Sequence, residues 1–203
     1  MKAAPDALAI FKQFVPEAAA PYCVRLYDHF GFEFKIKKAR LTKLGDFRFD
    51  PRSKKYTITV NNDLNPYGFL ITYLHEVAHL ITFEKHKNRV DPHGEEWKHN
   101  FRQICQPILH ESYLPLPVLT TLSRYLSNPK AASCSDPSLY LLLKKYDQPN
   151  GTLLLQSLQP GTTFYFNQKA YRYLEKKRTR ILCEAVITGR KYLISQLAEI
   201  SIT

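Results

Sequence analysis

The sequence predicts an α+β chain in which a helix-rich main domain precedes a small β meander. Apolar residues recur at helical spacing through most of the first 130 residues, alternate along one early hairpin, and form short strands after residue 153. A length of 203 residues with 44% hydrophobic content allows one sizeable core and a smaller unit. We therefore expect a main domain at 1–130, a linker at 131–152 and a small basic β unit at 153–203.

The first 62 residues are expected to form two short helices and a β-hairpin. Apolar side chains recur at helical spacing in residues 5–30, and prolines interrupt the pattern. Residues 39–49 and 55–61 have strand patterns, and Asp50-Pro51-Arg52-Ser53 supplies the turn between them. This hairpin leads into the most strongly predicted helix.

That helix begins at Asn65-Pro66, which places a capping side chain before a proline at the first helical position. Its apolar pattern continues to Ile81. Two further helices are expected, one from near Gly94 to about Leu109 and one at about 118–126. The prolines and small residues that follow indicate the linker.

Four short strands are expected in the C-terminal unit, because apolar segments there are separated by turn-like residues. Their expected ranges are 162–166, 170–174, 178–186 and 191–199. Together they predict a small meander.

Composition indicates a cytoplasmic protein that meets polyanions. The formal net charge is +11, with 29 Lys and Arg against 18 acids, which favours anionic partners or a solvated basic surface. The four cysteines stand far apart, as is typical of reduced, unreactive thiols. No signal peptide or membrane-spanning segment is recognisable, so we expect no membrane association.

A metal-binding motif lies on the best-predicted helix, in the sequence His75-Glu76-Val77-Ala78-His79. Residues four apart lie on one helix face, so both imidazoles can bind one zinc ion, with Glu76 beside a bound water. A catalytic zinc needs a third protein ligand and an open position. The spacing therefore predicts a zinc metallopeptidase in which Glu76 is the general acid and base.

The third ligand has several candidates. The preferred one is His93, in His93-Gly94-Glu95-Glu96-Trp97, because a histidine there can fold back across the loop while Trp97 walls the site. Carboxylates from Glu95 or Glu96, or imidazoles from His86 or His99, are the alternatives. Oxyanion stabilisation is open among Tyr73, His86 and Arg89.

The paired segments H-E-V-A-H and H-G-E-E-W resemble the SprT-like domain, the protease module of Spartan proteins. The resemblance extends from about Arg40 to Gln106. It implies a zincin-like fold, zinc ligands His75, His79 and His93, and catalytic Glu76, and it suggests substrates that are bound or crosslinked to DNA. Many relatives carry a cysteine zinc ribbon after the protease core, and Cys134 and Cys183 are too few to build one.

Two basic segments are candidates for nucleic-acid binding. In residues 169–180, Tyr171 and Tyr173 alternate with basic residues, as base stacking and phosphate contacts require. The four expected phosphate contacts are Lys176, Lys177, Arg178 and Arg180. In the alternative interpretation the tyrosines pack inward and the charges protect a strand edge. A second cluster holds Lys35, Lys37, Lys38, Arg40 and Lys43, with the same two interpretations.

Three functions remain open at this level. The first is a peptidase acting on DNA-bound proteins, and the second is a general cytoplasmic metallopeptidase without a nucleic-acid role. The third is a zinc-stabilised binding module without activity. Glu76 argues against the third, because a purely structural site needs no general base.

Overall fold

The computed structural model describes residues 6–40, 42–130, 136–148 and 151–202 of the chain. It is a mixed α+β structure, as the sequence predicts. The chain separates into two compact units, Met1–Asp147 and Gln148–Thr203. Each unit has its own cluster of buried apolar side chains.

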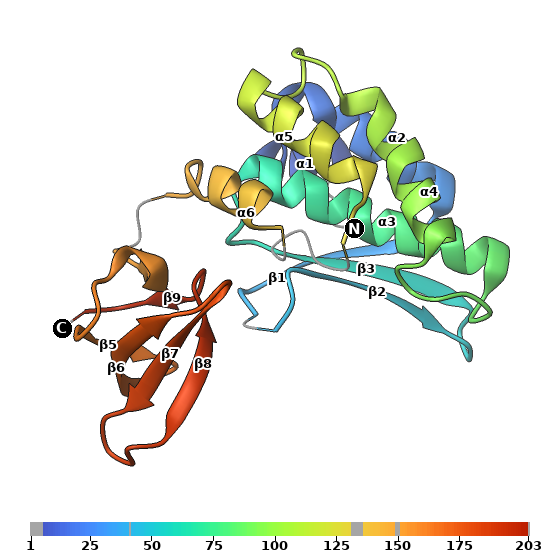
Figure 1. The fold of residues 1–203 in the computed structure, drawn as a ribbon. Helices are drawn as coiled ribbons and strands as arrows, with labels where there is room; N and C mark the ends of the chain where they lie inside the picture. The colour runs from blue at the N-terminus through green and yellow to red at the C-terminus, as the bar shows by residue number, and fades with distance from the viewer. Residues whose placement is uncertain (1–5, 41, 131–135, 149–150, 203) are drawn as a thin grey trace. The chain divides into compact units, whose positions relative to one another are not determined.

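Helix α3 (Pro66–His86) is the centre of the first unit. Its cap is the predicted one, because the Asn65 side chain accepts a hydrogen bond of 2.9 Å from the Gly68 backbone N–H. The residues from Gly68 to Ala78 are all buried. A helix buried on every side must lie between two other layers, and Figure 1 shows a sheet on one side of α3 and helices on the other.

The sheet of the first unit has three strands in the order β1-β3-β2. Strands β2 (Gly45–Asp50) and β3 (Lys55–Asn61) form the predicted antiparallel hairpin, although β2 begins six residues later than the expected 39. Strand β1 (Glu33–Lys37) was not predicted, and it pairs in parallel with β3. Helix α3, which carries the His75-Glu76 motif, packs on both strands of the hairpin, β2 and β3.

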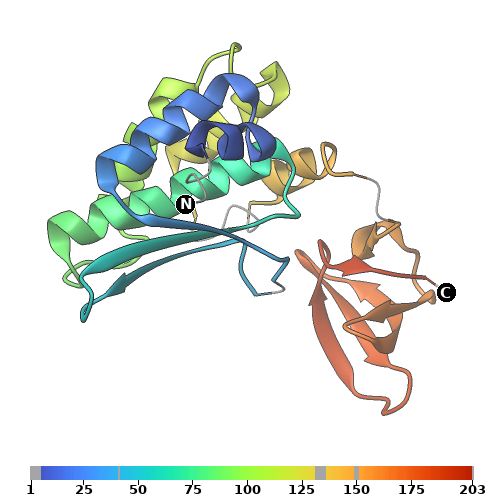
Figure 2. The same cartoon turned by 180° about the vertical axis from the view of Figure 1, so that it is seen from behind.

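Helices α1 (Ala7–Phe14) and α2 (Ala20–Phe30) are the two predicted N-terminal helices, and they cover the other side of α3 in Figure 2. Helices α4 (Glu95–Cys105) and α5 (Leu116–Ser127) also agree with expectation. Short 3₁₀ turns occur at Glu17–Ala19 and Gln106–Ile108. Helix α4 packs directly on α3, which brings the loop before α4 to the metal motif.

Part of the range 131–152 is helical, which differs from the predicted linker. Helix α6 (Pro137–Lys144) packs on α5 and buries Leu139 in the core of the first unit. The Asp136 side chain caps it by accepting from the Leu139 backbone N–H at 3.0 Å. Residues 131–135, including Cys134, lie outside the described residues.

The second unit contains the predicted meander. Strands β5 (Thr163–Phe166), β6 (Lys169–Lys176), β7 (Arg180–Ala185) and β8 (Lys191–Ser195) form an antiparallel sheet in sequence order. Two short strands, β4 (Leu153–Leu154) and β9 (Glu199–Ile200), pair separately, and a 3₁₀ turn follows β4 at Leu155–Ser157. One face of the sheet buries Phe164, Ile181 and Ile194.

Within the described ranges, no helix combines the length and apolar character that crossing a membrane would require. Cys23, Cys105 and Cys183 are buried and unpaired. Burial raises the pKa of the Cys183 thiol to about 11, so this side chain stays protonated, as expected for an unreactive thiol.

Candidate metal centre

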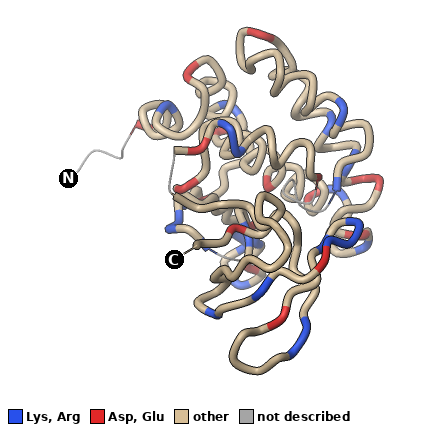
Figure 3. The backbone as a smooth tube through the Cα atoms, turned by 60° about the vertical axis from the view of Figure 1, so that its left-hand side comes forward, with Lys and Arg blue, Asp and Glu red and all other residues tan. Residues whose placement is uncertain are grey.

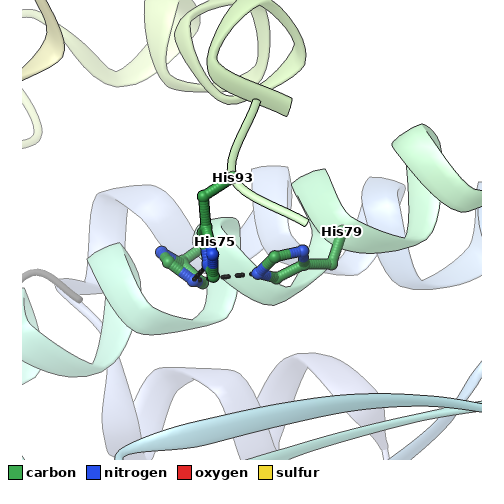
Figure 4. Close-up of side chains that lie close together, drawn as sticks. All are labelled: His75, His79 and His93. Atoms are coloured by element: carbon green, nitrogen blue, oxygen red, sulfur yellow. Dashed lines mark hydrogen bonds between the residues drawn. The ribbon is translucent and has the colours of Figure 1, made fainter. Parts of the chain in front are cut away.

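Three histidines converge beside α3. His75 and His79 lie one turn apart on the helix, and His93 comes from the loop before α4 (Figure 4). The Nε2 atoms of His75 and His79 are 3.1 Å apart, and those of His75 and His93 are 3.3 Å apart. Candidate ligand atoms of the three residues all lie within 4.8 Å of one another. In the described part of the chain, this is the one group of three or more His, Cys, Asp or Glu residues with such spacing.

These separations fit a tetrahedral metal. Zinc binds imidazole nitrogens at about 2.0–2.1 Å, so two nitrogens on a tetrahedral ion lie about 3.3 Å apart. The observed 3.1 and 3.3 Å agree with this value. Three ligands leave a fourth position open, which is the arrangement of catalytic rather than structural zinc sites.

The surroundings keep the three imidazoles neutral, which is the metal-binding form. Burial lowers the pKa of His79 to about 3, with a smaller contribution from His93. Burial also lowers the pKa of His75 well below its usual value, and that of His93 to a lesser extent.

Trp97 forms one wall of the centre, as the sequence predicts. Its ring centroid lies 4.7 Å from that of His75, 5.3 Å from that of His79 and 4.8 Å from that of His93. Trp97 is fully buried and stacks in turn on Phe101 of α4. The indole therefore restricts the orientation of all three rings and excludes water from that side.

Glu76 occupies a different face of α3, toward strand β2. It is only 7% exposed. Burial and the nearby Asp46 carboxylate raise the pKa of Glu76 to about 8, although the Phe47 backbone N–H hydrogen-bonds to it and Arg40 lies close enough to oppose the rise. A carboxyl group in such an environment can exchange a proton near neutral pH.

Asp46 is held by two cations. Lys43 Nζ lies 2.8 Å from one carboxylate oxygen of Asp46, and the Arg48 guanidinium contacts the other. Burial works against the ionised form, yet these hydrogen bonds hold the pKa of Asp46 below its ordinary value. A fixed negative charge therefore lies beside Glu76.

One cleft is lined by the three histidines, Glu76 and Asp46. Its volume is about 440 Å³, and it opens between β2, α3 and the loop after α3. Its lining includes the three histidines and Glu76, together with Gly45, Asp46, Phe47, Phe83, Lys87 and Asp91. Sequence reasoning missed Gly45, Asp46 and Phe47, because only the tertiary contact of β2 with α3 brings them to the site.

The other candidates for the third ligand lie elsewhere. Glu95 and Glu96 are exposed, and Glu95 pairs with Lys98 at 2.8 Å. His86 and His99 are not members of the cluster.

The expectation for Tyr73 as an oxyanion donor is wrong. Its side chain is fully buried, and its hydroxyl donates to the Cys23 carbonyl oxygen at 2.9 Å. Neither His86 nor Arg89 belongs to the cleft lining as described. Lys43 and Lys87 are the cationic side chains that do line it.

The predicted nucleic-acid contacts lie together at the turn between β6 and β7, where Lys176 is the last residue of β6 and Arg180 is the first residue of β7. Lys176, Lys177, Arg178 and Arg180 are all exposed, and Lys177 also pairs with Glu175 at 2.6 Å. Tyr171 and Tyr173 are buried at 8% and 4% exposure, so the inward-packing interpretation of these rings is the right one. Figure 3 shows the Lys and Arg positions spread along the chain.

Three members of the second basic cluster have partners within the first unit. Lys35 pairs with Glu33 at 2.9 Å, and Lys43 pairs with Asp46 at 2.8 Å. Arg40 donates to the Asn61 side chain at 2.7 Å, which is an internal contact. This segment is therefore partly structural.

The comparison with protein-family models gives one match, to the SprT-like family over residues 15–116. The chain belongs to the SprT-like family. The matched range runs from the residue after α1 to the start of α5, so it includes the sheet, helix α3 and the whole metal centre. Searches of curated proteins and of solved structures returned no match.

The SprT-like family is metallopeptidase-related, which agrees with the histidine cluster. The second unit lies beyond the matched residues. Its basic turn therefore has no support from the family match and stands on its own geometry.

Proposed function

We propose that this SprT-like protein is a zinc-dependent metallopeptidase with a zincin-like active site. The observation that carries the proposal is the convergence of three histidines: the Nε2 atoms of His79 and His93 lie 3.1 and 3.3 Å from that of His75, distances that suit one tetrahedral ion, and Glu76 lines the same cleft. A purely structural centre would need neither an open fourth position nor a neighbouring carboxylate.

The residues divide the work of peptide hydrolysis. His75, His79 and His93 would hold a zinc ion, which would lower the pKa of a coordinated water toward about 7 and polarise the substrate carbonyl. Glu76 accepts the proton of the attacking water and passes it to the departing amine, which its raised pKa permits. Trp97 excludes water from the side of the three histidines and holds their neutral rings in a fixed orientation.

The test compares wild type with Glu76→Gln. Elemental analysis should find one zinc per chain in both proteins, because Gln leaves the three histidines in place. Protease assays on a DNA-bound protein, with and without DNA, should show a loss of about 10²–10⁴-fold in Glu76→Gln. Equal rates would remove Glu76 as the base. A wild type that binds zinc and cuts nothing would favour the non-enzymatic binding module.

We further propose that the substrates are DNA-bound or DNA-crosslinked proteins, and that the turn between β6 and β7 contacts the phosphates. Support comes from the exposure of its four cations and from the formal charge of +11. DNA should then stimulate cleavage. If DNA neither binds nor stimulates, the general metallopeptidase without a nucleic-acid role becomes the better proposal.

A further inference from the structure

Gly45, the first residue of β2, lies directly against Glu76. A Cβ atom added to Gly45 would lie 2.5 Å from Glu76 Oε1, 2.7 Å from Glu76 Cγ and 2.8 Å from Thr72 Cγ2. Carbon atoms in ordinary contact are about 3.5–4.0 Å apart. The described glycines with positive φ do not include Gly45, so this position needs glycine for space and not for backbone conformation.

The same strand also holds the carboxylate by a hydrogen bond. The Phe47 backbone N–H hydrogen-bonds to Glu76, and the Phe47 ring packs toward Phe83, farther along α3. Gly45 and Phe47 are two apart and therefore face the same side of the sheet. Strand β2 thus supports Glu76 both by close packing and by a backbone donor.

Asn61 fixes the loop that delivers Gly45 to this position. It is the last residue of the central strand β3 and is fully buried. Its backbone N–H donates to the Leu44 carbonyl at 2.9 Å, and its side-chain Nδ2 donates to the Lys43 carbonyl at 2.9 Å. Its Oδ1 accepts from Arg40 Nε at 2.7 Å. The chain before Gly45 is therefore tied to the middle of the sheet.

We infer that Gly45 and Asn61 are positioning residues for the reaction: Gly45 lets the β2 backbone pack on Glu76, and Asn61 holds that backbone in place. The inference rests on the proposed function, because it assigns these residues to the placement of the proposed base. Neither residue is expected to touch the substrate. A base displaced by about 1 Å can lose about 100-fold in rate, so this support has a measurable effect.

The first experiment is Gly45→Ala with Gly68→Ala as the matched control. An added Cβ at Gly68 meets only the Asn65 side chain, at 3.6 Å or more. Gly45→Ala should lower kcat by about 100-fold while KM and zinc content stay near those of wild type, because the metal ligands lie on another face of α3. Gly68→Ala should leave kcat unchanged. A zinc-loaded Gly45→Ala protein with wild-type kcat would overturn the inference.

A double-mutant cycle in stability tests the contact even without activity. Glu76→Ala removes Oε1 and Cγ, the two Glu76 atoms nearest to a Cβ added at Gly45. Gly45→Ala should therefore lower the urea midpoint of the metal-free protein much more in the Glu76 background than in the background made by Glu76→Ala. Equal losses in the two backgrounds would show that Gly45 does not act through Glu76. An inactive wild type would overturn the proposed function, whereas this cycle would still decide the contact.

Asn61→Asp tests the proposed role of Asn61 with little change in the shape of the side chain. The substitution keeps an acceptor for Arg40 and removes the Nδ2 donor to the Lys43 carbonyl. We expect a lower kcat at unchanged zinc content. Asn61→Asp with wild-type kcat would remove Asn61 from the inference.

Discussion

The metal centre of the first unit and the basic turn of the second unit hold their side chains in different ways. Around His75, packed rings, a capped helix and a neighbouring loop fix each ligand. Around Lys176, the four cations are exposed in a turn and at the ends of the two strands that it joins. A metal site must hold its ligand atoms at about 2 Å from one ion, so its side chains must be rigidly positioned. Phosphates, in contrast, can be bound by flexible, exposed side chains. The two regions should therefore respond very differently to single substitutions.

The largest expected effect is the loss of metal in His93→Ala. Removing one of three ligands should weaken zinc binding by more than the ~10–100-fold that loss of a residue supporting a ligand typically costs. Competition with a chromogenic chelator measures the affinity. Glu95→Ala and Glu96→Ala are the controls and should retain zinc, because both side chains are exposed outside the cluster. The reverse pattern would make a carboxylate the third ligand.

Next in size is the cost of removing a buried ring from the second unit. Tyr171→Ala should destabilise the unit by about 3 kcal/mol, because it leaves a cavity in the small core. Tyr165→Ala is the control, since this ring on the adjacent strand is 38% exposed and its loss should cost about 0.5 kcal/mol. Thermal unfolding with and without single-stranded DNA separates core packing from stacking. A Tyr171→Ala protein with unchanged stability and weaker DNA binding would reverse our assignment.

A smaller effect is expected from the pH dependence of the metal-free protein. The folded-state pKa of Glu76, about 8, lies above the ordinary value of 4.5. The folded state therefore keeps this proton while the unfolded state loses it, so stability falls as pH rises from about 4.5 to 8. The Gln side chain of Glu76→Gln does not ionise, so the stability of this variant should not fall in the same way. At pH 8.5 its free energy of unfolding should have gained at least ~1.4 kcal/mol, the equivalent of one pKa unit, relative to wild type. Urea unfolding in EDTA measures the difference, and parallel curves for the two proteins would contradict it.

The smallest effect on stability is expected at the basic turn. Replacing Lys176, Lys177, Arg178 and Arg180 together by Ser should change unfolding by no more than about 0.5 kcal/mol for each exposed residue. The slope of log affinity for single-stranded DNA against log salt should flatten by up to about 3, since each phosphate contact contributes about 0.7. The same slope in variant and wild type would remove the turn as the contact, leaving residues 35–43 as the next candidate.

The metal motif could be predicted from local sequence signals. The features that were not predicted depend on tertiary contacts. Helix α3 and the pairing of His75 with His79 follow from a cap, a proline and a spacing of four residues. Helix α6 carries the same kind of signal in Asp136-Pro137, but the surrounding prolines and small residues favoured a linker. Strand β1 has apolar Phe34 and Ile36 between charged residues, yet its parallel pairing depends on a distant partner.

The supports of the site could not be deduced in this way. Gly45 acquires its role only because β2 crosses close to α3, and no sequence spacing encodes that distance. The burial of Tyr171 and Tyr173 likewise depends on which face of the meander closes over a core. His93 is an intermediate case. It could be predicted as the preferred third ligand because its loop is short and leads into a helix that packs on α3.

The position of Trp97 gives the protein a built-in optical reporter. It is the only tryptophan in the sequence, and its ring contacts all three histidines of the centre. Intrinsic emission excited at long wavelength therefore arises next to the three candidate metal ligands. Cobalt or copper, which have partly filled d shells, should quench this emission on binding, whereas zinc should not. Titrating one metal against another can thus be followed on the unlabelled chain.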